Sequence, residues 1–89
     1  MKGPKKKTNA VHQDPRNLLK KVGTKLKQRR KELGYENGDD FAYDSGINRS
    51  QYGKYEAGSQ DMRFSTLIRT VNSLGLTIEE FFSKGLDSN

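Results

Sequence analysis

Apolar residues recur three and four positions apart along much of this chain, which is the period of an amphipathic helix. The first such stripe consists of Leu18, Leu19, Val22, Leu26 and Leu33. Asp14 and Pro15 precede it as an N-cap acceptor and a first-turn proline, so they predict where the helix begins. Gly34 predicts its end. Gly23 weakens the predicted helix without breaking it.

Two shorter helices are predicted next. Asn37 can cap the first one, and Asp40, three residues later, is favoured near a helix N-terminus. Phe41 and Ala42 face inward, and Gly46 ends this helix. The following helix opens at Asn48 or Arg49, runs to about residue 57 and ends at Gly58. Its inner face carries two aromatic residues, Tyr52 and Tyr55.

Two amphipathic helices complete the chain. The apolar stripe of the first consists of Phe64, Leu67, Ile68, Val71 and Leu74, with Gly75 after it. A capping box from Thr77 to Glu80 opens the last helix, which directs Ile78, Phe81 and Phe82 inward and stops near Gly85. No segment alternates convincingly like a strand. The predicted fold is therefore all-α with five helices.

Charge is distributed unevenly along the chain. The net charge is +6, but residues 1–33 carry nine Lys and three Arg against two acidic residues. Residues 1–13 lack periodicity and are predicted to be a disordered basic arm, residues 14–86 one folded domain, and residues 87–89 a tail. This pattern fits either a surface aimed at a polyanion or a solvated lysine segment.

Several function classes have no support in the residues. There is no cysteine, and His12 is the only histidine, so neither a thiolate site nor a Ser-His-Asp arrangement is expected. The carboxylate pairs Asp39–Asp40 and Glu79–Glu80 each open a helix, where capping and charge explain them. We expect no enzyme, no cofactor and no metal. No apolar run is long enough to span a bilayer, and the lack of cysteine fits a reducing compartment, so a cytoplasmic location is expected.

The segment from Phe41 to Gly58 has the detailed pattern of a helix-turn-helix. A small residue, Ala42, stands where two helices would cross most closely. Gly46 supplies a left-handed turn and Ile47 fills it. The outer face of the second helix is left with polar and small residues that can reach base edges or phosphates: Arg49, Ser50, Gln51, Gly53 and Lys54.

With these residues in place, the chain resembles the phage Cro/repressor-like helix-turn-helix domains of bacterial transcriptional regulators over roughly residues 18–82. The resemblance includes Arg30 before a Leu-Gly helix end, the F-A-x-x-x-G-I core from Phe41, and Tyr55-Glu56-Ala-Gly58. It implies a structural ion pair between Arg30 and Glu56. It also implies base contacts by Arg49, Ser50 and Lys54, and contacts to the DNA backbone by Asn48 and Gln51.

Three features depart from the family pattern. Gly38 stands where the family often has a phosphate-clamping glutamine; its backbone can still bind phosphate, although Asp39 and Asp40 oppose this. Tyr52 and Tyr55 replace the usual aliphatic residues, so their hydroxyls are expected at the DNA surface. Arg63 replaces a capping residue and is expected to contact phosphate. Arm lysines are expected to contribute phosphate contacts as well: Lys2, Lys5, Lys6 and Lys7.

These features predict a sequence-specific regulator that binds double-stranded DNA as a homodimer. Phe81, Phe82 and Leu86 form the dimer surface, or else Phe81 and Phe82 close the monomer core. The alternative is a protein-interaction module, like an antitoxin or co-regulator, whose partner binds an acidic patch: Glu36, Asp39, Asp40 and Asp44.

Overall fold

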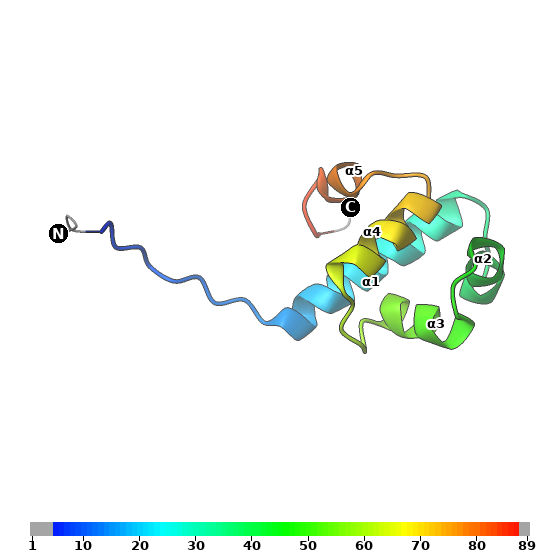
Figure 1. Ribbon diagram of the computed structural model, residues 1–89, viewed down its shortest axis with the longest axis horizontal. Helices are drawn as coiled ribbons and strands as arrows, with labels where there is room; N and C mark the ends of the chain where they lie inside the picture. Colours follow the sequence, from blue (N-terminus) through cyan, green and yellow to red (C-terminus); the bar gives the residue numbers. More distant parts are fainter. Residues whose placement is uncertain (1–4, 88–89) are drawn as a thin grey trace.

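The computed structural model describes residues 5–87 and contains five α-helices (Figure 1). They are α1 (Pro15–Glu32), α2 (Gly38–Ser45), α3 (Arg49–Ala57), α4 (Phe64–Ser73) and α5 (Ile78–Phe82). No strand occurs within the described residues, so the all-α prediction is confirmed. Lys2 and the end of the predicted tail lie outside these residues.

Local hydrogen bonds explain where most of the helices begin. Asp14 accepts a bond from the backbone N–H of Arg16 at 3.0 Å, and Asn37 accepts one from Asp40 at 2.9 Å. Thr77 and Glu80 form the predicted capping box at the start of α5. Each bond satisfies a backbone donor that the first turn of a helix leaves unpaired.

The helices enclose one small core. Figure 1 shows α4 in front of α1, with α3 below them, α2 at one end and α5 above. Residues 5–14 form an exposed segment without regular structure that leads away from the beginning of α1. The core draws side chains from all five helices: Leu26, Phe41, Ala42, Tyr52, Tyr55, Leu67, Val71, Leu74 and Phe81.

Two residues of the predicted stripes are exposed. Leu33 is 43% exposed because α1 ends at Glu32 and Leu33 lies at its C-cap, beyond the part of the helix that its neighbours cover. Phe64 is 63% exposed because it is the first residue of α4. Helical side chains lean toward the N-terminus, so a first-turn side chain points past the end of the helix. Periodicity alone does not show these end effects.

Candidate nucleic-acid interface

The inner face of α3 is held firmly against the core. Tyr52 is 1% exposed and its ring packs on Phe41, with the ring centroids 5.1 Å apart. The turn from α2 is equally tight: Gly46 adopts a left-handed conformation, and the backbone N–H of Ile47 donates to the carbonyl of Ala42 at 2.8 Å. Such packing fixes the direction in which α3 presents its other face.

The hydroxyl of Tyr52 does not emerge at the surface, which corrects the expectation from sequence. It is buried and makes no hydrogen bond within the described residues. Burial first, and then the nearby carboxylate of Glu56, raise the pKa of Tyr52 above its usual range. Tyr55 is 7% exposed, and its hydroxyl accepts a hydrogen bond from Gln51 Nε2 at 3.3 Å. The tyrosines are long enough to reach past the inner face, but neighbouring helices cover them.

An ion pair joins α1 to α3. Arg30 Nε lies 2.7 Å from Glu56 Oε2, and Arg30 Nη2 donates to Glu56 Oε1 at 3.0 Å. Arg30 Nη1 also donates to the carbonyl of Tyr35 at 2.8 Å. The hydrogen bonds and charge of Glu56 raise the pKa of Arg30. A two-point contact between side chains that are only 4% and 13% exposed sets the rotation of α3 against α1.

Two glycines allow α1 and α3 to touch at backbone distance. A Cβ atom on Gly23 would lie 2.3 Å from the carbonyl oxygen of Glu56. A Cβ atom on Gly58 would lie 2.6 Å from the Cα atom of Lys20. Gly23 therefore has a packing role. Gly23 was interpreted from the sequence only as a weak helix former, and this role was missed. The signal available in the sequence was a glycine inside a strongly predicted helix.

The outer face of α3 is open to solvent. Arg49, Ser50, Gly53 and Lys54 are exposed, and a Cβ atom on Gly53 would meet nothing within 4 Å. Neither Arg49 nor Lys54 forms an ion pair with any residue from 5 to 87. The predicted base-contacting side chains therefore share one uncovered surface.

Two further predicted contact residues lie at the start of α3 and already have protein partners. Asn48 Oδ1 caps the helix by accepting a bond from the N–H of Gln51 at 2.9 Å. Gln51 is half-buried, and its amide is the group that donates to Tyr55. These contacts hold both side chains in place beside the open face.

The remaining predicted contacts are spread around this face. Gly38 is half-buried at the start of α2, where a Cβ atom would lie 3.2 Å from the ring of Tyr52. The large Tyr52 ring thus occupies space next to the position where the family often has a glutamine. Arg63 is exposed before α4 and makes no capping bond. Exposed lysines of the segment before α1 complete the set: Lys5, Lys6 and Lys7.

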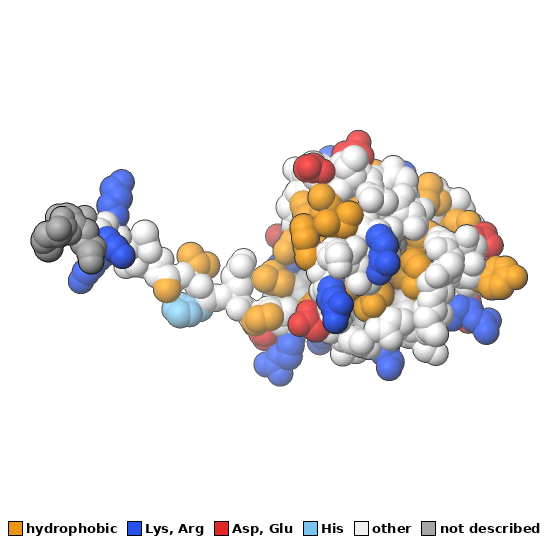
Figure 2. Space-filling model, in the orientation of Figure 1, with side chains coloured by type: hydrophobic (Ala, Val, Ile, Leu, Met, Phe, Trp, Pro, Cys, Tyr) orange, Lys and Arg blue, Asp and Glu red, His pale blue; other side chains and the backbone are white. Residues whose placement is uncertain are grey.

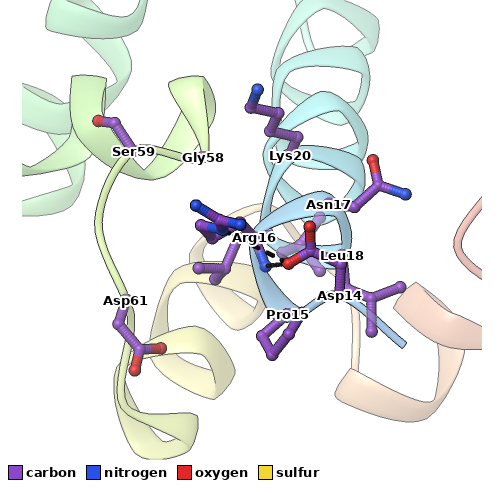
Figure 3. Close-up of a pocket in the computed structure, with 11 residues that line it drawn as sticks. Asp14, Pro15, Arg16, Asn17, Leu18, Lys20, Gly58, Ser59 and Asp61 are labelled. Atoms are coloured by element: carbon purple, nitrogen blue, oxygen red, sulfur yellow. Dashed lines mark hydrogen bonds and ion pairs between the residues drawn. The ribbon is translucent and has the colours of Figure 1, made fainter. Parts of the chain in front are cut away.

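A groove that the sequence did not indicate lies beside the C-terminal end of α3 (Figure 3). Its walls are the first turns of α1 and the segment from Gly58 to Asp61. Apolar side chains of α1 line it, together with Arg16, Lys20 and the carboxylates Asp14 and Asp61; Arg16 Nε lies 3.5 Å from Asp14 Oδ1. The groove leaves these two basic side chains of α1 accessible on the side that faces α3.

Positive charge gathers on the same side of the molecule as α3. Figure 2 shows Lys and Arg side chains along the lower edge of the body, where α3 and the beginning of α1 lie in Figure 1. Acidic side chains gather over α5 at the opposite edge. This polarity favours approach of a polyanion from the α3 side.

The described residues contain neither a group of three or more side chains suited to hold a metal ion nor a helix long and apolar enough to cross a membrane.

A model of the helix-turn-helix family matches residues 26–81, which include the last turns of α1, all of α2 to α4, and most of α5. The chain belongs to the Cro/repressor-like helix-turn-helix family. Searches of curated proteins and of solved structures found no match. The family binds DNA, so the open face of α3 is the candidate DNA-binding surface of this helix-turn-helix protein.

Proposed function

We propose that this helix-turn-helix protein is a transcriptional regulator that recognises a specific double-stranded DNA sequence with α3 in the major groove. One observation carries the proposal. The inner face of α3 is locked by Tyr52, Tyr55 and Glu56, while its outer face is entirely polar or small and uncovered. A helix presented in this way fits a major groove about 12 Å wide.

Arg49, Ser50 and Lys54 are the proposed base-reading residues. A guanidinium group can donate two hydrogen bonds to O6 and N7 of guanine, and hydroxyl and ammonium groups reach other base edges. Gly53 lies between them on the open side, where its missing side chain allows the backbone of α3 to approach the bases closely.

Phosphate contacts are proposed for the residues around this face. Asn48 and Gln51 lie at the start of α3, and Arg63 lies on the connection to α4. The backbone at Gly38 can offer an N–H group. The three lysines of residues 5–7 extend the positive charge along the duplex.

A homodimer on a partly palindromic operator completes the proposal, with half-sites about one helical turn apart. Phe81 is 3% exposed and belongs to the monomer core, whereas Phe82 and Leu86 remain half-buried. Phe82 and Leu86 therefore offer apolar surface that a second copy can cover.

Selection of bound duplexes from a random-sequence pool tests this function. An enriched, partly palindromic sequence is expected, and recovery of no preferred sequence at moderate salt would refute it. Against the selected duplex, Arg49→Ala should weaken binding by about 1–3 kcal/mol and relax the choice at one base position. Lys84→Ala, on an exposed residue after α5, is the control and should leave the base preference unchanged. An equal loss across all sequences would mean that Arg49 contacts only phosphate.

A second candidate is a protein-interaction module. Tyr43 on α2 is 79% exposed, and acidic residues surround its position in the sequence: Glu36, Asp39, Asp40 and Asp44. An exposed aromatic ring among carboxylates suits a basic partner protein. Failure of the DNA selection would favour this candidate.

A further inference from the structure

A second basic surface lies on α1, apart from the residues assigned to α3 and to the segment before α1. It consists of Lys20, Lys27 and Lys31, which we call the α1 stripe. At 100° per residue, the three positions fall within about 40° of one another around the helix axis. All three are exposed, and none forms an ion pair with another described residue. By contrast, Lys21 pairs with Asp87.

The α1 stripe borders the line where α1 touches α3. Gly23, whose Cβ position is 2.3 Å from the Glu56 carbonyl, is three residues after Lys20 and four before Lys27. The backbone of Lys20 itself packs against Gly58. Figure 3 shows Lys20 on the side of α1 that faces the segment following α3. Lys20 is thus a neighbour of the end of α3 in space, and Lys27 lies one turn beyond the contact at Gly23, although both are distant from α3 in sequence.

α1 packs along the side of α3 that carries Glu56. Tyr52 and Tyr55 point from α3 into the core, whereas Glu56 points from α3 to Arg30 on α1. A helix is about 10–12 Å across, and packed helices lie about 8–10 Å apart. When α3 occupies a groove about 12 Å wide, a helix at its side lies over the edge of the groove, where the phosphates run.

We propose that the α1 stripe binds the phosphodiester backbone along one edge of the major groove that α3 enters. This inference rests on the proposed DNA-binding function and adds a contact surface to it. The stripe covers about 16 Å between Lys20 and Lys31 at 1.5 Å per residue. That length corresponds to about five phosphates along one strand. The stripe anchors the domain without reading sequence, because phosphate contacts carry no base information.

The test compares two triple variants that lose the same charge. K20Q/K27Q/K31Q removes the α1 stripe, whereas K21Q/K25Q/K84Q removes three lysines from other positions. Circular dichroism verifies that both fold. Binding to a fluorescein-labelled random-sequence duplex of roughly three helical turns is measured by anisotropy between about 50 and about 200 mM salt. Each lost phosphate contact lowers the slope of log affinity against log salt by about 0.9.

If the α1 stripe contacts phosphate, wild-type affinity should fall about 40-fold more over this salt range than that of K20Q/K27Q/K31Q, because three contacts are lost. The control variant should retain nearly the wild-type slope. Equal slopes in wild type and the stripe variant would overturn this inference and leave the function of α3 intact. An equal decrease of this slope in both variants would also overturn the inference, since the lower net charge would then explain the decrease. A wild-type protein that binds no duplex even at low salt would refute the proposed function together with the stripe.

Discussion

Replacing Gly23 with alanine tests the contact between α1 and α3. Helix propensity alone predicts that this change stabilises the protein by about 1 kcal/mol, because alanine is the better helix former. The structure predicts the opposite sign. The new Cβ atom would lie 2.3 Å, 2.6 Å and 2.8 Å from backbone atoms of Glu56 and Tyr55, and no side-chain rotation relieves a clash with backbone.

The size of the effect follows from the displacement that is needed. Real Cβ atoms stay at least about 3.0 Å from such atoms, so α3 must move away from α1 by about 0.7 Å. Overpacking of this kind costs typically about 1–3 kcal/mol, and occasionally more. The same movement weakens the Arg30–Glu56 pair, whose shortest contact is 2.7 Å. The propensity gain of about 1 kcal/mol offsets part of this cost and the weakened ion pair adds to it, so we expect Gly23→Ala to lower the free energy of unfolding by about 1–2 kcal/mol.

Gly53→Ala is the matched control. Gly53 also lies inside a helix, but its Cβ position has no neighbour within 4 Å. This variant should gain about 0.5–1 kcal/mol of stability. Urea unfolding followed by circular dichroism measures both variants. The reasoning would be refuted if Gly23→Ala were as stable as wild type or more stable while Gly53→Ala showed its expected gain.

Two further predictions concern the buried groups under α3. Glu56→Ala leaves the Arg30 guanidinium buried without its partner and should cost about 3–5 kcal/mol in urea unfolding. Adding Arg30→Met should recover part of this loss, and a double variant no more stable than Glu56→Ala would contradict the pairing. Burial holds the folded-state pKa of Tyr52 above its ordinary value of 10.0. Its contribution to stability is therefore complete below about pH 10 and declines above it, by up to about 1.4 kcal/mol per pH unit. Tyr52→Phe should make that alkaline decline shallower, whereas identical pH profiles would argue against a buried hydroxyl.

The proposed DNA-facing surface combines residues that the sequence could and could not reveal. The exposed face of α3 was foreseeable, because Tyr52 and Tyr55 mark its inner side and Arg49, Ser50 and Lys54 fall elsewhere. The position of the α1 stripe was not. Periodicity shows which face of α1 is apolar, but it does not show which helix lies next to the polar face.

The sequence by itself determined the local features of this protein. Asp14, Asn37 and Thr77 begin helices because each side chain bonds to a backbone group two or three residues away. Gly46 and Gly58 end helices because they adopt left-handed conformations without steric cost. These interactions lie within one turn of the chain, so they can be predicted without knowledge of the fold.

Only the tertiary structure decided the features that depend on contacts between distant segments. It buried the Tyr52 hydroxyl, exposed Leu33 and Phe64, and turned Gly23 from a weak point of α1 into its contact with α3. The burial of the Tyr52 hydroxyl and the contact at Gly23 have one physical reason. Whether a side chain is covered, or a missing one is needed, depends on how closely another helix approaches, and neither propensity nor periodicity contains that distance.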